Sequence, residues 1–316
     1  MMTLWALMRR ELWESPGTFR WLPLVLAILV LVVMLLPLGF IGRIDAGFSS
    51  TLDGLRMFAE QDYEFRRNIV FGGLVGIAAF FNVALLFVIF FYLAGSLYDD
   101  RKDRTILFWK SLPVSDSATV ASKLLTACLL LPAFYLAGIL IAQVLILLLA
   151  TGYSLAAGVN AWTTLWQPAG LPGLWLGLVV GYLVQALWIM PLFGWVMLCS
   201  AWAPRFPVLI AVAVPLIIGL VQHYYSFLTR MRFAEGNVLE HIGTRLAEST
   251  IPLEARVETE AGNVTFMSGG QIAAEEVTRL GYLASRLTDS SLWIGIAIGL
   301  LFLAGAVWGR KRATDN

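Results

Sequence analysis

A dense run of charged residues interrupts a chain that is otherwise strongly apolar. Nine charged side chains fall between Leu97 and Lys123: Asp99, Asp100, Arg101, Lys102, Asp103, Arg104, Lys110, Asp116 and Lys123. Two aromatic residues, Phe108 and Trp109, follow the densest part of the run. Mixed charges beside large aromatic side chains are typical of a surface that binds another protein. The segment therefore predicts protein contact rather than bond-making chemistry.

The same segment carries the marks of two helices. Ile106, Leu107, Phe108 and Trp109 could form the apolar face of a short helix, which we expect to end at 111–113, because a residue that precedes proline is pushed away from helical angles. Either Ser115 or Ser117 can then cap a second helix that passes through Lys123.

Residue sets that support catalysis are missing from this sequence. His223 and His241 are its only histidines, so no histidine cluster can hold a metal, and no Gly-x-Ser-x-Gly motif with a plausible base occurs. No phosphate-binding Gly-x-x-x-x-Gly-Lys-Ser/Thr loop is present either. Cys128 and Cys199 fall in apolar segments, which favours packing over a disulfide. We expect neither an enzyme nor a bound cofactor or metal, and any ATP must be bound by another polypeptide.

Composition places the chain in the membrane. Hydrophobic residues make up 59% of the 316 residues and charged residues only 14%, more apolar side chain than a soluble domain of this size can bury. The net charge of +1 and the lack of a basic domain argue against nucleic acid as a partner. The fold class we expect is an all-α polytopic membrane protein in contact with the lipid bilayer.

Six apolar runs are long enough to cross a bilayer, which takes about 20 residues each. They cover residues 21–42, 70–97, 124–150, 174–202, 207–228 and 291–309. The expected organisation is an interfacial helix over 1–20, spans one to five over 21–228 with the charged loop 98–123, an extracytoplasmic domain over 229–290, and span six with a basic tail over 291–316.

These spans contain no Asp, Glu, Lys or Arg, which argues against a proton-coupled carrier. Their deep polar residues, Asn82, Gln143, Gln185 and Gln222, favour hydrogen bonds between helices. A path lined by neutral groups and aromatics would suit a hydrophobic or amphipathic cargo. Gly72 and Gly76 form a small-xxx-small pair that predicts close helix packing.

The N-terminal segment predicts an amphipathic helix rather than a cleaved signal peptide. Leu4, Trp5, Met8 and Leu12 recur at helical spacing, with Arg9 and Arg10 elsewhere on the helix, and Pro16-Gly17 ends it. Such a helix lies in the membrane interface.

Basic residues in the short loops predict the orientation. With the N-terminus inside, twelve of the 22 lysines and arginines are cytoplasmic, and the outer loop 151–173 has none. Both termini are then cytoplasmic.

Two outer segments have structure of their own. Residues 49–67 predict an amphipathic helix. Within 229–290, Val238, Leu239, Ile242 and Leu246 predict one helix, alternation over 256–266 predicts a hairpin, and a last helix leads to span six. We therefore expect a small α+β insertion between spans five and six.

The charged loop resembles the cytoplasmic loop between spans two and three of ABC-2-type transporter permeases. The resemblance lies in Ser111-Leu112-Pro113-Val114-Ser115 with Lys123 after it; Arg104-Thr105 and Ser122-Lys123 stand where that family usually has Gly-Thr and Gly-Lys. It implies a six-span permease subunit of an ATP-binding-cassette exporter in the bacterial inner membrane.

The resemblance also implies partners. Two permease subunits, identical or different, would pair and bind separate ATPase subunits, which bind the ATP. The coupling contacts would come from Asp99, Asp100, Arg101, Lys102, Asp103, Arg104, Thr105, Phe108 and Trp109, and from the interfacial helix with Trp5, Met8, Arg9, Arg10 and Leu12. The sequence selects no cargo, and the direction of transport rests on the resemblance alone. The alternative is a non-transporting membrane scaffold or assembly factor whose outer domain binds an envelope partner.

Overall fold

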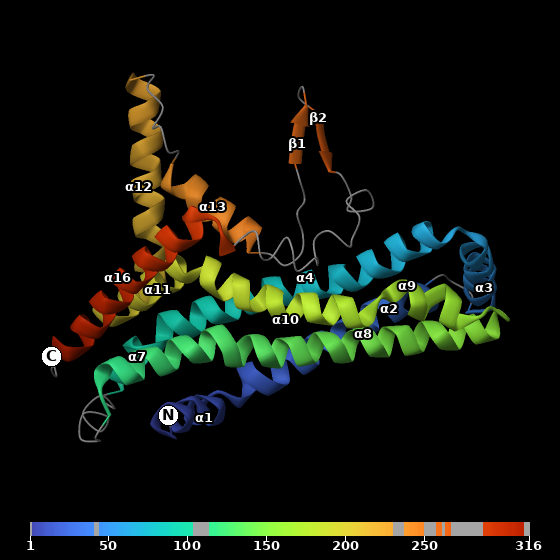
Figure 1. The fold of residues 1–316 in the computed structure, drawn as a ribbon, viewed down its shortest axis with the longest axis horizontal. Coiled ribbons are helices and arrows are strands. Elements are labelled where there is room, and N and C mark those ends of the chain that lie inside the picture. Colours follow the sequence, from blue (N-terminus) through green and yellow to red (C-terminus); the bar gives the residue numbers. More distant parts are fainter. Residues whose placement is uncertain are drawn as a thin grey trace.

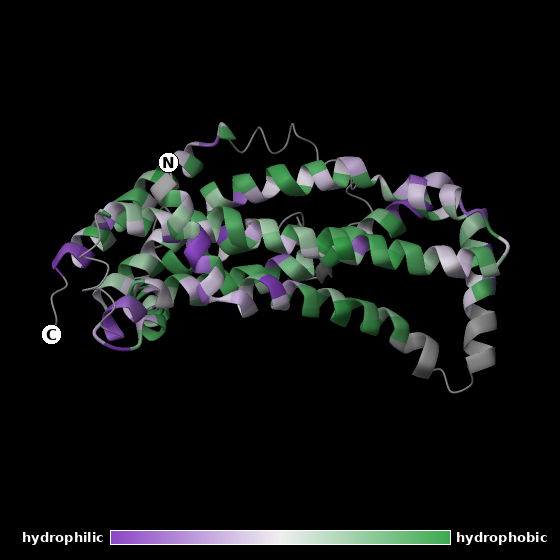
Figure 2. Ribbon diagram, turned by 90° about the horizontal axis from the view of Figure 1, so that it is seen from below, coloured by the Kyte–Doolittle hydropathy of each residue, from purple (hydrophilic) through white to green (hydrophobic). Residues whose placement is uncertain are grey.

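The computed structural model describes residues 2–40, 44–103, 114–229, 237–249, 257–260, 263–266 and 287–312. Within them, six helical segments are long and apolar enough to cross a membrane: Gly17–Leu35, Tyr63–Lys102, Asp116–Ala156, Trp162–Trp188, Pro207–Thr229 and Ser290–Arg312. The expectation of a helical, multi-pass membrane protein with six spans is confirmed. Figure 2 shows the long hydrophobic stretches and the hydrophilic ribbon near the C-terminus.

The described residues form thirteen α-helices, three short π-helical segments (Gly17–Trp21, Thr126–Leu130 and Trp162–Trp166) and two strands. The helices are α1 (Met2–Glu14), α2 (Leu22–Phe40), α3 (Ile44–Glu60), α4 (Tyr63–Ser96), α5 (Tyr98–Lys102), α7 (Asp116–Leu125), α8 (Leu131–Ala156), α9 (Gln167–Ala169), α10 (Leu171–Trp188), α11 (Met190–Trp202), α12 (Pro207–Thr229), α13 (Val238–Glu248) and α16 (Ser290–Arg312). Strands β1 (Val257–Glu260) and β2 (Asn263–Phe266) pair antiparallel, with Val257 opposite Phe266. Figure 1 shows α4, α8 and α10 running lengthwise beside one another, while α12 rises away from them.

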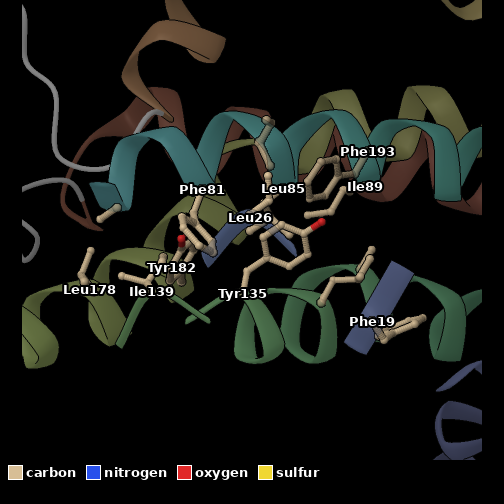
Figure 3. Packing of buried hydrophobic residues seen from close by; sticks show 14 of the residues in the cluster. Phe19, Leu26, Phe81, Leu85, Ile89, Tyr135, Ile139, Leu178, Tyr182 and Phe193 are labelled. Atoms are coloured by element: carbon tan, nitrogen blue, oxygen red, sulfur yellow. The ribbon is translucent and has the colours of Figure 1, made fainter. Parts of the chain in front are cut away.

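The core of the bundle lies between α4, α8, α10 and α11. Phe81, Tyr135 and Leu178 are completely or almost completely buried there, and Figure 3 shows the side chains from α4, α8 and α10 facing one another. Such packing brings the helices together without any charged group.

Deep amide side chains bond one helix to another, as predicted. Gln185 of α10 donates to Asn82 of α4 over 3.0 Å, and Asn82 donates to the carbonyl of Ser249 at the end of α13. Gln143 of α8 donates to the carbonyl of Leu74 in α4 over 3.0 Å. Unsatisfied polar groups are costly in an apolar surrounding, so these bonds fix the helices relative to one another.

The fourth predicted span, 174–202, is not one helix. α10 ends at Trp188, and α11 begins at Met190 after Ile189 leaves helical angles (φ −87°, ψ 1°). Pro191 is in the first turn of α11, where its missing N–H breaks no hydrogen bond. The guanidinium of Arg245 in α13 donates to the carbonyl of Trp188 over 2.7 Å, so a neighbouring helix satisfies a carbonyl at the break.

Glycines bring α11 and α16 into backbone contact. A Cβ atom on Gly194 would lie 2.6 Å from the carbonyl oxygen of Gly299, and one on Gly299 would lie 2.8 Å from that of Met190. Only hydrogen fits at either position. The prediction of close packing at Gly72 and Gly76 is wrong within this chain, because added Cβ atoms there would meet no described atom within 4 Å.

The two predicted outer helices have different outcomes. Residues 49–67 belong to two helices, because α3 ends at Glu60 and Asp62 caps α4 by accepting from the N–H of Phe65. The helix predicted around Val238–Leu246 is confirmed as α13, which begins with a capping box formed by Asn237 and Glu240. The last helix expected before span six lies largely outside the described residues.

Candidate functional site: a buried charge cluster at one end of the bundle

Charged side chains from four helical segments meet at the end of the bundle that holds both terminal helices. The group, here called the end cluster, consists of Glu11 (α1), Asp100 (α5), Asp116 and Lys123 (α7) and Arg310 (α16). Both α1 and α16 pack on α7, so Glu11 and Arg310, which are 299 positions apart in the sequence, belong to one cluster.

Lys123 and Arg310 hold the carboxylates of the cluster together. Nζ of Lys123 lies 3.2 Å from Oε1 of Glu11 and 3.7 Å from Oδ1 of Asp100. The guanidinium of Arg310 donates to Oδ2 of Asp100 over 2.8 Å and to Oδ1 of Asp116 over 3.1 Å. Asp100 therefore joins the two cations, which makes the cluster a single network rather than separate pairs.

The network is almost completely buried. Lys123 is 4% exposed and Arg310 is 3% exposed, and Glu11 and Asp100 are also buried. The hydroxyl of Tyr92 in α4 donates to the second oxygen of Glu11 over 2.9 Å. Buried charges are tolerated when they are paired and hydrogen-bonded, and loss of one partner leaves the other with an uncompensated charge. The cluster thus fixes α1, α5, α7 and α16 in one arrangement.

Arg101 forms a second internal anchor next to the cluster. Its guanidinium donates to the carbonyls of Ser200 and Ala203, over 2.8 and 2.9 Å, at the C-terminal end of α11. In return, the hydroxyl of Ser200 accepts from the backbone N–H groups of Leu97 and Tyr98, over 3.0 Å each, where α4 gives way to α5. A cation at a helix C-terminus is favourable because the last carbonyls lack partners within the helix.

The residues predicted to bind an ATPase therefore divide into groups. Asp100 and Arg101 are engaged inside the chain, whereas Asp99, Lys102 and Asp103 are exposed. Arg104, Thr105, Phe108 and Trp109 lie outside the described residues. Of the two residues predicted as the cap of α7, Ser115 and Ser117, the structure has Ser115: its hydroxyl accepts from the N–H of Ala118 over 3.2 Å.

The N-terminal helix α1 packs one side against the bundle and exposes the other. Met8 is buried against the bundle and Leu12 is half-buried, whereas Trp5 is 58% exposed. Arg9 lies over the ring of Trp13, and Arg10 pairs with Glu14. The buried residues of α1 are Leu7, Met8 and Glu11, and Glu11 reaches Lys123.

Sequence reasoning missed Glu11, Lys123 and Arg310 as one site. Each is a charged residue next to an apolar stretch, and that position is the available signal. Their partners are far apart in the sequence, so only the packing of α1 and α16 on α7 brings them together.

The end cluster joins four helices through ion pairs. Within the described residues, no group of three or more His, Cys, Asp or Glu side chains could hold a metal ion. The carboxylates of the end cluster are already paired with cations, and its exposed neighbours form an acidic and basic rim. No family model matches this chain, and no significantly similar curated protein or solved structure was found.

Proposed function

We propose that this chain is the permease subunit of an ABC-2-type ATP-binding-cassette exporter in the bacterial inner membrane. It would work as a homo- or heterodimer, with both termini cytoplasmic, and ATP would be hydrolysed by a separate ATPase subunit. The proposal rests on the loop motif Leu112-Pro113-Val114-Ser115 with Lys123, and on the geometry around the end cluster.

One observation carries the proposal. The two segments expected to contact an ATPase, α1 and the loop 98–123, meet at the same end of the bundle, where Glu11 of α1 pairs with Lys123 at the end of that loop. Helix α1 also packs along α7. A partner bound at this end could therefore touch both segments at once.

The same geometry would connect an ATPase bound to the loop with the membrane-spanning helices. Asp100 lies at the start of the loop and Asp116 lies near its end, and both bond Arg310 of α16. Arg101 adds a bond to the end of α11. When the ATPases close on ATP, movement of the loop would be passed to spans four and six as a rigid-body shift.

The surface for the partner would be the exposed part of the loop. Asp99, Lys102 and Asp103 provide charge, and Arg104, Phe108 and Trp109 would add a polar contact and an aromatic anchor. Trp5 and Trp13, both exposed on α1, would lie at the membrane interface as an interfacial helix requires. The cargo is unidentified, and the neutral spans suit a hydrophobic or amphipathic molecule.

Affinity purification of the tagged full chain in a gentle detergent, with mass spectrometry and an ATPase assay, tests the proposal. We expect an ATPase with a phosphate-binding loop to co-purify. A clean preparation without one refutes the exporter and favours the alternative, a scaffold whose outer residues 229–290 bind an envelope partner.

A charge-exchange variant tests which surface binds. Lys102→Asp combined with Asp103→Lys reverses two exposed charges and leaves the end cluster intact. It should lower ATPase recovery without changing the melting temperature. Lys311→Glu is the matched control, because Lys311 is exposed at the same end but lies outside the loop. Equal recovery from both variants would place the ATPase contact elsewhere.

A further inference from the structure

An apolar cavity lies among the spans, away from the end cluster. It has a volume of about 290 Å³ and is bounded by α4, α11, α12 and α13. Phe90 of α4, Phe193 of α11, Leu216 of α12 and Ile242 of α13 represent its four walls. It is formed within one chain and needs no second subunit.

The walls offer nothing to a polar ligand. Every described side chain that lines the cavity is apolar, apart from the indole N–H of Trp195, and that group donates to the carbonyl of Ala211 over 3.0 Å. Ala211 needs this donor because Pro215, four residues later, has no N–H to give it. A water molecule in a cavity needs two to four polar partners, so this cavity suits an apolar occupant.

The cavity lies at membrane depth, so its wall α13 lies beside the spans, although the segment 229–290 to which it belongs was expected to be extracytoplasmic. Leu86 and Phe90 precede Leu97, the residue that caps the end of α4, by eleven and seven residues. At 1.5 Å per residue they lie roughly 10–17 Å from that end, near the middle of a hydrocarbon layer about 30 Å thick. The surrounding solvent at this depth is hydrocarbon, which supplies an occupant of the required chemistry.

Hydrogen bonds at both ends of α13, the fourth wall of the cavity, hold this helix in place. At the start of α13, the side chain of Asn237 donates to the carbonyl of Gly219 over 2.9 Å, and the N–H of Val238 donates to Gln222 over 2.9 Å. Near its end, Arg245 donates to Trp188 and Ser249 accepts from Asn82. The cavity is therefore preformed, which lowers the cost of binding.

From these features we infer that the cavity binds one hydrocarbon chain of a bilayer phospholipid. An apolar cavity of about 150 Å³ holds one benzene molecule, so this partly open pocket of about 290 Å³ accepts a segment of an acyl chain. Binding should be insensitive to the headgroup, because no described charged side chain lines the walls. This inference does not depend on the proposed transport function.

Photolabelling of the full chain in nanodiscs tests the inference. Trace phosphatidylglycerol or phosphatidylethanolamine with a diazirine in the middle of one acyl chain is photolysed, and the adducts are mapped by mass spectrometry. We expect both probes to label α13 at Ile242. No label on α13 from either probe would overturn the inference.

A matched pair of variants distinguishes the cavity from the open bilayer. Val212→Trp places an indole in the cavity, whereas Val221→Trp makes the same change on α12 outside it; the two valines are 51% and 61% exposed. Each buried methylene group contributes roughly a fourfold factor in affinity, so displacing two should lower the labelling of Ile242 by about an order of magnitude. Val221→Trp should leave it unchanged.

A second substitution guards against a misfolded variant. Leu216→Trp fills the cavity from the next turn of α12, and the melting temperature shows whether each variant is folded. If a folded Val212→Trp or Leu216→Trp variant still shows undiminished labelling of Ile242, the label comes from lipid outside the cavity. That result would overturn the inference.

Discussion

Replacement of Lys123 by methionine tests the end cluster most directly. The substitution keeps the length and packing of the side chain but removes the charge that lies 3.2 Å from Glu11 and 3.7 Å from Asp100. Asp100 retains Arg310 at 2.8 Å, so Glu11 becomes the uncompensated group, with only the hydroxyl of Tyr92 as a described partner.

The expected magnitude follows from burial. Removing one partner of a buried ion pair costs about 3–5 kcal/mol, because the remaining charge stays out of water. In a large domain each kcal/mol shifts the melting temperature by about 2 °C, so Lys123→Met should lower it by roughly 6–10 °C. The measurement is thermal unfolding of the purified chain in detergent, with Lys311→Met as an exposed control that should not shift.

A double variant separates lost charge pairing from lost packing. Glu11→Gln removes the orphaned charge but retains an oxygen that can accept from Tyr92. The Glu11→Gln/Lys123→Met variant should therefore be more stable than Lys123→Met alone, because the two changes are coupled. The reasoning is refuted if Lys123→Met melts like the wild-type chain, or if the double variant loses the sum of the two single effects.

Three further substitutions test other parts of the structure. Gly299→Leu should destabilise the chain by at least about 1–3 kcal/mol in a thermal melt, because a Cβ atom there would lie 2.8 Å from the carbonyl oxygen of Met190; an unchanged melt would contradict the α11–α16 contact. Arg245→Ala should speed hydrogen exchange in the first turn of α11, since a carbonyl at the α10–α11 break loses its donor; unchanged exchange would show that this bond does not hold the break. Ser115→Ala should weaken the start of α7 by about 1 kcal/mol, seen as faster exchange in its first turn, whereas exchange at the other end of the helix should stay the same.

The membrane architecture was predictable from the sequence because it depends on local composition. Six apolar runs of sufficient length are visible in the residues themselves, and the cap of α7 was predicted as Ser115 or Ser117, of which Ser115 forms it. The deep amides were also assigned correctly to bonds between helices, since Asn82 and Gln185 have few other ways to satisfy their polar atoms in an apolar bundle.

The end cluster was not predictable in the same way, because its pairings join distant segments. Nothing near Arg310 indicates that its carboxylate partners lie at Asp100 and Asp116, and the spacing of apolar residues in α1 did not reveal that Glu11 faces inward. The glycine contacts show the same limit: the motif at Gly72 and Gly76 is a local pattern, whereas contact depends on which helix lies opposite.

The backbone contact between α11 and α16 has a consequence for how the chain can deform. With no side chain between the backbones at Gly194 and Gly299, the two helices cannot slide or roll against each other without collision, so they form one stiff strut. At the C-terminal ends of the two helices, Arg101 bonds α11 and Arg310 of α16 bonds Asp100. At the other end, α11 begins after Ile189, where the helical hydrogen bonding between α10 and α11 is interrupted. Bending between α10 and α11 should therefore occur at Ile189, which acts as a hinge between α10 and the rigid α11–α16 pair.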